Sequence, residues 1–292
     1  MRVTIDARYI RTPPSGIGAY TQALVARLPA LDPGARFHLW RSPTHQGGRL
    51  SEAENTTEQS VAEPANSVAT LLRHGTLGAL EDADVFHAPF NILGRGVSCP
   101  SVVTVHDLMW LQSPALCEPS WVKRIGLERF YGFGIGRALR HASRIVTISH
   151  ASAAAIRRHM PDVSERVRVI PHGVESRFRP SDTPSATQER AAELVGSDAP
   201  YLLVVGQNAP YKNHRAVINA FAASKRGDAK LVLLQRLNTS ADLAALAKRR
   251  GVKDAVIFLP VATADDALCL MQAAAALVQF SRQEGFGMPA LE

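Results

Sequence analysis

Short apolar runs alternate with stretches of helical spacing along almost the whole chain, and this alternation limits the folds that the sequence can adopt. Residues 201–205, for example, are typical of a buried strand, and residues 213–223 after them are typical of an amphipathic helix. Repeated strand–helix units predict parallel sheets joined by right-handed crossovers, which places the chain in the α/β class. Strands are expected at 2–6, 36–40, 84–87, 101–106, 144–149, 166–170, 201–205, 230–234, 255–259 and 275–280, and helices at 18–28, 149–160, 213–223, 241–250 and 264–273.

Two stretches interrupt this alternation and divide the chain. Residues 43–70 are polar and rich in Ser, Glu, Asn, Thr and Pro, which indicates a loop or a poorly ordered insert. Residues 176–199 contain prolines and Ser-Asp pairs before a short helical stretch, which is typical of an interdomain linker. The sequence therefore predicts two Rossmann-like domains, 1–178 and 179–292, whose parallel sheets face a cleft.

Composition favours a soluble enzyme without disulfides or a membrane span. The 292 residues are 46% hydrophobic and 20% charged, which is enough to form sizeable cores in two domains. The three cysteines, Cys99, Cys117 and Cys269, are scattered, which argues against a zinc site or a disulfide framework. No run approaches the ~20 apolar residues of a membrane span, and we expect a cytoplasmic protein.

Positive charge is concentrated in one part of the chain. The formal net charge is +7, and residues 121–180 hold 12 Lys and Arg against 4 Asp and Glu. Within 121–144 the bases are mixed with aromatic residues, which leaves two interpretations open: a surface helix with solvated bases, or a patch that binds an anionic membrane surface. Nucleic-acid binding is not supported, because no RNA-binding or helix-turn-helix pattern is present. Glycines at 132, 134 and 136 argue against one continuous helix here.

Glycines follow the first predicted strand and open the first helix. Gly16 and Gly18 let backbone N–H groups and the helix dipole approach a diphosphate closely. No third glycine follows at the spacing of the dinucleotide fingerprint, which argues against a nicotinamide enzyme. Glycine is also common in strand–helix turns that bind nothing.

Polar residues at other strand ends are further candidates. His106 and Asp107 follow an apolar strand, and the pair either faces a ligand or consists of a buried histidine that is bonded to its neighbour. His87 and His172 show the same pattern more weakly. Lys212 lies at a helix start after a strand, where a cation can neutralise a diphosphate or simply be solvated.

The most specific pattern is at residues 284–292, Glu-Gly-Phe-Gly-Met-Pro-Ala-Leu-Glu, which place seven residues between two carboxylates. The glycines allow a tight turn after a predicted strand, and Pro289 suits the first turn of a helix. We therefore expect Glu284 at the carboxyl end of a strand and Glu292 about two turns into the next helix. Ligands bind at that edge of open α/β sheets, where a carboxylate accepts hydrogen bonds from sugar hydroxyls. The alternative is an ordinary strand–turn–helix with two exposed acids.

Residues 284–292 resemble the E-x7-E signature of the retaining family-4 glycosyltransferases, which have the GT-B fold. Further blocks resemble the family in its own order: 5–8 with 15–20, 84–89, 103–108, 147–149, 167–174 and 204–213. The glycine loop, the His-Asp-Leu block and the Asn-Ala-Pro-Tyr-Lys-Asn block look most like bacterial mannosyltransferases of surface-polysaccharide assembly.

This resemblance implies that a hexose moves from a nucleotide sugar, with GDP-mannose as our first expectation, to a glycan or lipid-linked glycan acceptor. The first domain would lie on the acceptor side and the second would bind the donor, without a metal or another cofactor, since no Asp-x-Asp motif is present. The resemblance assigns catalysis to Glu284, His106 and Lys212. It assigns substrate binding to Gly16, Gly18, Asp107, Asn208, Gly285, Phe286, Gly287 and Glu292, with Glu292 on the ribose.

The chain departs from the family pattern in two ways. In the family an arginine often lies immediately before the residue that matches Lys212 or a few residues earlier. This chain has Gln207, Asn208 and Tyr211 at these positions, and Arg282 is a candidate substitute. The second domain has few recognisable strands and is expected to be incomplete, as in a C-terminally truncated chain. Two alternatives therefore remain: a nucleotide-sugar-binding protein or fragment without activity, and another GT-B enzyme such as a sugar-nucleotide epimerase, whose pattern we do not find.

Overall fold

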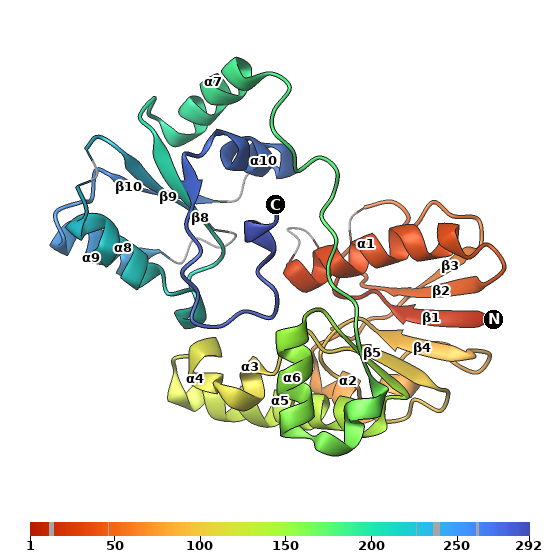
Figure 1. Ribbon diagram of the computed structural model, residues 1–292. Helices are drawn as coiled ribbons and strands as arrows, with labels where there is room; N and C mark the ends of the chain where they lie inside the picture. Colours follow the sequence, from red (N-terminus) through yellow and green to blue (C-terminus); the bar gives the residue numbers. More distant parts are fainter. Residues whose placement is uncertain (12–14, 46, 226, 236–239, 261–262) are drawn as a thin grey trace. The chain divides into compact units, whose positions relative to one another are not determined.

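The computed structural model describes residues 1–11, 15–45, 47–225, 227–235, 240–260 and 263–292. These residues form two compact units, and each unit is built on a parallel sheet (Figure 1). The first unit comprises residues 1–114 and 120–172, and the second comprises 115–119 and 173–292. The predicted α/β class is therefore confirmed.

The first unit has a seven-stranded sheet in the order β3-β2-β1-β4-β5-β6-β7, in which all neighbours are parallel. The strand order reverses between β1 and β4, and in open α/β sheets ligands bind beyond the carboxyl ends of the strands at such a point. Six of the seven strands agree with the predicted ones to within two residues. Their bounds are β1 Arg2–Asp6, β2 Arg36–Arg41, β3 Thr56–Ser60, β4 Val85–Ala88, β5 Ser101–Thr104, β6 Arg144–Thr147 and β7 Val167–Val169.

Strand β3 corrects the prediction that residues 43–70 form a loop or a poorly ordered insert. Its sequence is Thr-Thr-Glu-Gln-Ser, and it pairs in parallel with β2 from Phe37↔Thr56 to Arg41↔Ser60. The strand lies at the edge of the sheet, where polar side chains are normal because one side has no neighbouring strand. Its polar composition therefore resembled that of a loop.

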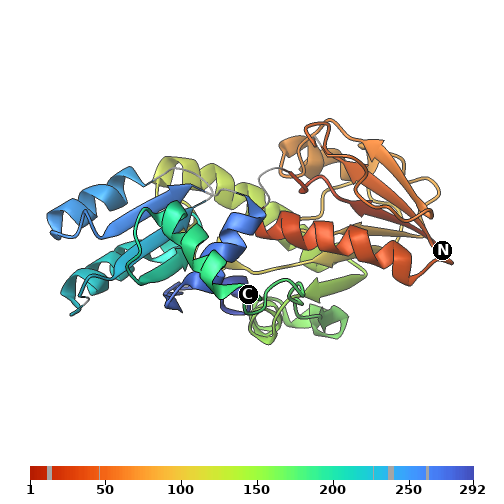
Figure 2. The same cartoon turned by 90° about the horizontal axis from the view of Figure 1, so that it is seen from above.

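Helices cover both faces of this sheet. Val25 and Leu28 of α1 (Gly16–Leu31) pack on Ile5, Phe37 and Leu39, and Figure 2 shows α1 lying along this face. On the other face a larger cluster includes Trp40, Phe86 and side chains of α2 and α5. The remaining bounds are α2 Val68–Arg73, α3 Met109–Gln112, α4 Pro114–Cys117, α5 Trp121–His141 and α6 His150–His159, with short 3-10 turns at His74–Thr76 and Pro161–Arg166.

Helix α5 is continuous over 21 residues, although its glycines weakened the prediction of a single helix. A Cβ at Gly134 would lie 2.6 Å from Cγ2 of Ile92, and this close approach requires glycine. The C-terminal end of α5 is capped by Arg166, whose guanidinium donates to the carbonyl oxygens of Leu139 (2.8 Å) and Ala142. Tertiary packing and this cap therefore offset the low helix propensity of glycine.

The second unit has a four-stranded parallel sheet in the order β10-β9-β8-β11. Alternate residues of β9 point to opposite faces: Leu231 and Leu233 join the cluster of α8 and α9, while Val232 and Leu234 join that of α7 and α10. The bounds are α7 Pro184–Val195, β8 Tyr201–Val205, α8 His214–Ala223, β9 Lys230–Gln235, α9 Ala241–Arg249, β10 Val256–Pro260, α10 Ala264–Ala273 and β11 Ala276–Leu277, with 3-10 turns at Pro210–Lys212 and Met288–Ala290.

Three predictions for this unit need correction. The short helical stretch expected within 176–199 is present as α7, but its Ala191 and Val195 pack in the core of the unit, so this part of the predicted linker belongs to the domain. Strand β11 has two residues instead of six, because after the bond from Val278 N–H to the Leu203 carbonyl the chain leaves the sheet. Glu292 does not lie two turns into a helix: it follows one 3-10 turn, and its N–H donates to the Met288 carbonyl at 3.1 Å.

None of the helices within the described ranges is both long and apolar enough to cross a lipid bilayer.

Candidate active site

The strongest candidate in the second unit is a lysine–glutamate pair. Nζ of Lys212 lies 2.7 Å from Oε1 of Glu284, and the two side chains are 13% and 24% exposed. Lys212 ends the 3-10 turn after β8, and its aliphatic part passes Gly206, where a Cβ would lie 3.1 Å from Cε of Lys212. Gly206 has φ of +133°, a conformation that only glycine adopts readily. The loop is therefore shaped to let this lysine cross its backbone.

Glu284 is held by a second donor that the sequence analysis did not single out. Oγ of Ser281 donates to Oε1 of Glu284 at 2.6 Å, so one carboxylate oxygen receives both Ser281 and Lys212. Within the described residues, the other oxygen, Oε2, has no hydrogen-bond partner. The three-residue spacing between Ser281 and Glu284 was the only signal in the sequence for this contact.

The glycines after Glu284 make the turn that the sequence predicts. Gly287 has φ of +96°, a conformation that glycine adopts readily and other residues rarely, and a Cβ there would lie 2.8 Å from Nε2 of the flexible Gln279 side chain. Gly285 and Phe286 lie in the same turn, half-buried. Arg282 is exposed, and its main-chain N–H donates to the Tyr211 carbonyl.

The side chain of Asn208, in the loop after β8, is hydrogen-bonded to helix α9. Its Nδ2 donates to Oδ1 of Asp242 in the first turn of α9 at 2.8 Å, and Asp242 also pairs with Arg215 at 3.2 Å. The amide therefore joins the loop after β8 to α9.

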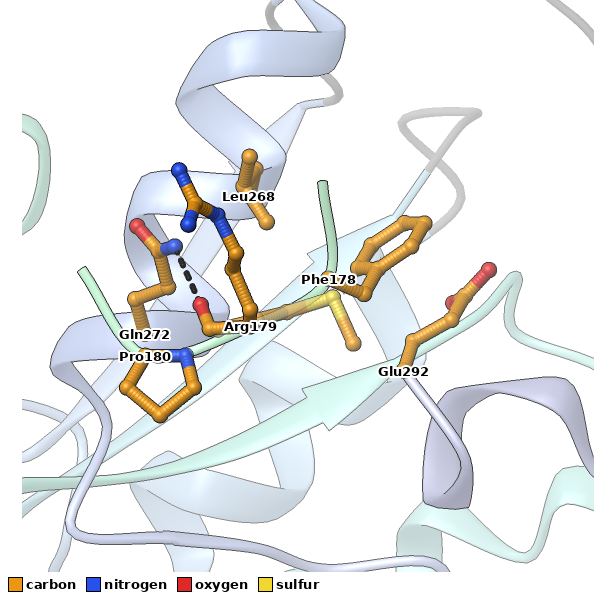
Figure 3. Close-up of a pocket in the computed structure, with 7 residues that line it drawn as sticks. Phe178, Arg179, Pro180, Leu268, Gln272 and Glu292 are labelled. Atoms are coloured by element: carbon orange, nitrogen blue, oxygen red, sulfur yellow. Dashed lines mark hydrogen bonds between the residues drawn. The ribbon is translucent and has the colours of Figure 1, made fainter. Parts of the chain in front are cut away.

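Glu292 lines a pocket of about 220 Å³ between the segment before α7 and helix α10 (Figure 3). Gln272 of α10 donates to the carbonyl of Arg179 across this pocket at 2.7 Å. Burial raises the pKa of Glu292, an effect that Arg177 partly opposes and Glu175 reinforces. Lys212 and Glu284 do not line this pocket, so the two carboxylates of the motif belong to different surroundings.

The two glycines of the predicted phosphate-binding loop in the first unit, Gly16 and Gly18, differ in their surroundings. Oγ of Ser15 caps α1 by accepting from the Gly18 N–H at 3.1 Å, and a Cβ at Gly18 would lie 2.8 Å from the Tyr9 carbonyl oxygen. Gly18 is therefore needed for packing. Gly16 is exposed, and outside its own helix no atom of the described residues lies within 4 Å of the place of a Cβ, so this part of the chain leaves its backbone at the helix N-terminus open to a ligand.

His106 is buried, but it is not bonded to Asp107 as the alternative interpretation had it. Its Nε2 donates to the Pro89 carbonyl at 3.0 Å, whereas Oδ1 of Asp107 accepts from the Met109 N–H at the start of α3. Burial lowers the pKa of His106 to about 4; the Pro89 bond opposes this shift, and His172 adds to it. With the proton on Nε2, the neutral ring keeps Nδ1 as an acceptor.

Aromatic and hydroxyl groups surround His106. The ring of Tyr20 lies 5.1 Å from that of His106 and 5.0 Å from that of His172, in edge-on arrangements. The Tyr20 hydroxyl and Nε2 of His87 both contact Oγ1 of Thr104, at 3.1 and 3.0 Å. Tyr20 and Thr104 were not predicted from the sequence. Tyr20 lies one helical turn after Gly16, and Thr104 lies two residues before His106, on the same face of an extended segment. The cluster is uncharged at neutral pH, and across the described residues no three His, Cys, Asp or Glu side chains converge on a metal position.

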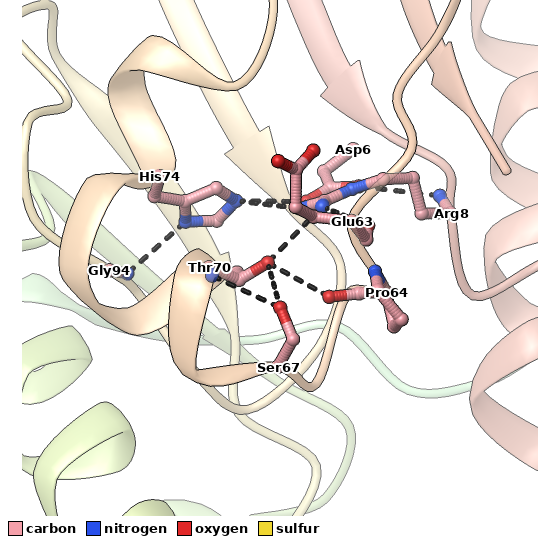
Figure 4. Close-up of polar contacts among 8 residues, drawn as sticks. All are labelled: Asp6, Arg8, Glu63, Pro64, Ser67, Thr70, His74 and Gly94. Atoms are coloured by element: carbon pink, nitrogen blue, oxygen red, sulfur yellow. Dashed lines mark hydrogen bonds and ion pairs between the residues drawn. The ribbon is translucent and has the colours of Figure 1, made fainter.

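A different arrangement lies at the end of β1, where a fully buried ionic network joins distant segments (Figure 4). Asp6 accepts from Arg8 at 2.7 and 2.5 Å and from Nε2 of His74 at 2.8 Å. Arg8 also donates to the Glu63 carbonyl, and Nδ1 of His74 accepts from the Gly94 N–H. Both carboxylate oxygens are occupied and shielded from solvent, which indicates a structural role.

Known structures resemble this fold closely. WaaG, a glycosyltransferase involved in lipopolysaccharide biosynthesis, superposes with a TM-score of 0.73 at 20% identity, covering 99% of this chain and 77% of that one. Anabaena HepE, crystallised in complex with UDP-glucose, superposes with a TM-score of 0.61 at 16% identity, covering 96% and 74%. The fold is therefore that of the GT-B glycosyltransferases.

Sequence comparisons give the family. The model for Glycosyltransferase Family 4 matches residues 14–178, more than half of the chain, and the model for glycosyl transferases group 1 matches 185–292. The chain belongs to glycosyltransferase family 4. The resemblance inferred from the motifs is thereby confirmed at the level of fold and family.

Two curated proteins with different names are similar to this chain in sequence. A D-inositol 3-phosphate glycosyltransferase of Acidothermus cellulolyticus is 29% identical over 231 residues, covering 72% of this chain and 49% of the relative. An MMP alpha-(1->4)-mannosyltransferase of Mycolicibacterium hassiacum is 25% identical over 227 residues, covering 74% and 52%. The chain thus spans about half the length of the curated relatives that it matches.

Proposed function

We propose that this chain acts in retaining transfer of a hexose from a nucleotide sugar to a hydroxyl of a glycan or lipid-linked glycan, in surface-polysaccharide synthesis. The observation that supports this most is the Lys212–Glu284 pair, a cation and a partly free carboxylate next to each other beyond β8 and β11. Membership of family 4 supports the same reaction class.

In this proposal the second unit, from residue 179, binds the donor. Lys212 neutralises the leaving diphosphate, and Glu284 accepts hydrogen bonds from the transferred hexose through its free oxygen. The bond between the anomeric carbon and the diphosphate oxygen breaks, and its electron pair stays with the diphosphate. The oxygen of the acceptor hydroxyl bonds to the same face of the anomeric carbon, and its proton passes to the departing diphosphate oxygen. Such a reaction depends more on fixed charges near the leaving group than on a strong base.

The first unit supplies the acceptor side together with groups near the scissile bond. The open backbone at Gly16 would approach the donor phosphates through the N-terminus of α1, and Gly18 fixes that turn. His106, neutral because burial holds its pKa at about 4, would contact the sugar as a hydrogen-bonding group rather than as a general acid. Asp107 fixes the backbone after β5.

The donor that we propose is GDP-mannose, with Glu292 on the ribose, and no metal is required. A mannosyltransferase among the relatives supports mannose, whereas UDP-glucose is the ligand of one structural neighbour and is therefore the main competitor. Calorimetric titration of the whole chain with GDP, UDP, GDP-mannose and UDP-glucose in metal-free buffer tests this. Selective binding of GDP and GDP-mannose supports the proposal, and preference for the uridine pair overturns the donor assignment.

Transfer itself needs a separate assay, because a nucleotide-sugar-binding protein without activity is the second candidate. Incubation with a labelled donor and a membrane lipid extract should yield labelled glycolipid, and the Glu284→Gln variant should lose on the order of 10²-fold or more in rate. Donor binding without any transfer or donor hydrolysis would favour the second candidate, which the half-length match to the relatives also keeps open.

Helix α5 supports a membrane-associated site of action in the cytoplasm. Its first turns expose Trp121 (67%), Val122 (62%) and Ile125 (41%), next to the basic residues Lys123, Arg124 and Arg129. Aromatic and apolar side chains mixed with bases bind anionic lipid interfaces, and a lipid-linked acceptor would be found there. The aromatics further along, Phe130 and Tyr131, pack on the core instead, so only part of 121–144 is available to a membrane.

Vesicle co-sedimentation tests this association. Binding to vesicles with anionic lipid, but not to neutral ones, should drop several-fold in Trp121→Ala. The matched control is Leu31→Ala, which removes another exposed apolar side chain, 78% exposed, at the end of α1. Equal losses in both variants would contradict a specific lipid contact of α5.

A further inference from the structure

The segment that carries Glu284 is irregular, yet it is tightly fixed. After β11 the last sheet hydrogen bond runs from Val278 N–H to the Leu203 carbonyl at 2.7 Å, and residues 279–287 have no strand or helix. Regular secondary structure therefore does not set the distance between Glu284 and Lys212. Other contacts must do so.

Two contacts join this segment to the loop that carries Lys212. The Arg282 N–H donates to the Tyr211 carbonyl at 2.7 Å, and Nδ2 of Asn213 donates to the Phe280 carbonyl at 3.3 Å. Asn213 has φ of +59°, the one non-glycine residue with positive φ in the described part of the chain. Asparagine tolerates this conformation better than most residues, and strained backbone of this kind persists where the surroundings hold it.

Ser281 acts directly on the carboxylate. Its hydroxyl donates to the same Oε1 of Glu284 that Lys212 contacts, at 2.6 Å, so both donors use one oxygen and leave the other for a ligand. The ammonium of Lys212 ends a flexible four-carbon stem, and in the proposed reaction it also serves the diphosphate. Ser281 has a short, neutral side chain, so its hydrogen bond to Glu284 persists when Lys212 also contacts the diphosphate.

We propose that Ser281 is a positioning residue: it orients Glu284 toward the transferred sugar, on a backbone that Asn213 fixes. This inference rests on the proposed function, because it assumes that Glu284 contacts the sugar and Lys212 the diphosphate. It predicts different effects on two ligands. Loss of Ser281 should weaken binding of the nucleotide sugar and leave binding of the nucleoside diphosphate unchanged.

Calorimetry of the whole chain tests this with GDP-mannose and GDP, or with UDP-glucose and UDP if the uridine pair binds better. Ser281→Ala should bind the nucleotide sugar about 10-fold more weakly, because a hydrogen bond to a charged group is lost, and the diphosphate within 2-fold of the unchanged chain. Ser281→Thr, which keeps the hydroxyl, should restore most of the affinity. The control is Ser224→Ala, whose hydroxyl donates to the Phe221 carbonyl in the C-terminal turn of α8.

A second variant keeps the test independent of Ser281. Asn213→Gly keeps the left-handed backbone but removes the amide, and should show the same ligand difference at a smaller size, about 3-fold. Equal weakening of both ligands, or no weakening of either, would overturn the positioning role. Failure of the unchanged chain to bind any nucleotide sugar would instead overturn the proposed function, and the role of Ser281 with it.

Discussion

Asp6 in the first unit ends a parallel strand, Glu284 in the second follows one, and each carboxylate pairs with a cation, but their surroundings differ. Asp6 is inaccessible, and its two oxygens receive three side-chain bonds from Arg8 and His74 and one main-chain bond from the Arg8 N–H. Glu284 is 24% exposed and uses one oxygen, for Lys212 and Ser281. The comparison teaches that the number of carboxylate oxygens already hydrogen-bonded separates a structural ion pair from a candidate reactive one. Both oxygens of Asp6 are occupied, so Asp6 cannot bind a ligand, whereas Glu284 has one oxygen left for a ligand.

The electrostatics agree with this distinction. Burial alone would raise the pKa of Asp6, but the charge of Arg8 and the hydrogen bonds from Arg8 and His74 outweigh burial and hold that pKa well below its usual range. Burial lowers the pKa of His74, so the ring is neutral and its Nε2–H serves Asp6. Breaking such a network leaves an uncompensated buried charge, whereas breaking the Lys212–Glu284 pair leaves groups that water can reach.

The largest effect should come from Asp6→Ala. The substitution leaves Arg8 buried without its carboxylate, and we expect the first unit to lose about 3–5 kcal/mol of unfolding free energy. All three tryptophans, Trp40, Trp110 and Trp121, belong to the first unit, so urea unfolding followed by tryptophan fluorescence reports on it. Asp82→Ala, which breaks an exposed pair with Arg2, is the control and should cost less than about 1 kcal/mol. Similar losses of unfolding free energy in the two variants would contradict the structural role assigned to the buried Asp6 network.

Acid should destabilise the first unit more than the second. Burial lowers the pKa of both His87 and His106 to about 4, against 6.5 for the free side chain, and lowers that of His74 as well. The unfolded chain therefore binds more protons below pH 6.5, so stability is full above that pH and falls as the pH approaches 4. On the order of 2 kcal/mol should be lost at pH 5 for each of His87 and His106, and the lowered pKa of His74 adds a loss of the same sign.

The second unit contains a single histidine, His214, whose pKa is lowered to about 4 by burial and then by Lys212. Hydrogen exchange at pH 7 and pH 5 separates the two units. Protection should fall more in the strands β1, β4 and β5 than in β8 and β9. An equal fall of protection in both sheets would contradict the prediction that the buried histidines of the first unit make it more sensitive to acid.

Glycine substitutions in α5 test how tightly the first unit is packed around its core. In Gly134→Ala the new Cβ would meet Ile92 and Leu71, and we expect a loss of about 1–3 kcal/mol. In Gly132→Ala the nearest atom is Cδ2 of Leu111 at 3.9 Å, so the better helix former should instead add about 0.5–1 kcal/mol. Thermal unfolding followed by circular dichroism measures both, and effects of the same sign would show that packing at Gly134 is looser than described.

The smallest effect on stability should come from Lys212→Ala. The pair is partly solvated, and its loss should cost about 1 kcal/mol or less. Urea unfolding of the second unit, followed by far-ultraviolet circular dichroism, checks this. A loss of several kcal/mol would mean that Lys212–Glu284 is a structural pair like Asp6–Arg8.

Much of the fold could be predicted, because strand–helix alternation and buried apolar runs are local properties of the sequence. The exceptions have physical causes. Strand β3 is polar because it lies at an edge, α5 continues through Gly134 because a neighbour requires the space, and β11 ends after two residues because loop contacts take over. Each depends on a distant partner that no local pattern contains.

The candidate site, like the fold, was predicted from the sequence only in part. The motif spacing indicated Lys212 and Glu284, and the structure brings them within 2.7 Å. Their supports, Ser281 and Asn213, and the surroundings of His106 formed by Tyr20 and Thr104, were missed. Those contacts join segments that are far apart in sequence, or depend on rotamers and on one positive φ. Motifs indicate which groups could react, and the fold determines how they are held.

The most direct test of the account compares Lys212→Met with the unchanged chain by calorimetric titration with the preferred nucleoside diphosphate, without metal. If Lys212 neutralises the diphosphate, loss of a charge-assisted bond should weaken binding about 10- to 100-fold while the unfolding free energy changes by about 1 kcal/mol or less. Unchanged affinity in a folded variant would contradict the assignment of the Lys212–Glu284 pair as the donor site.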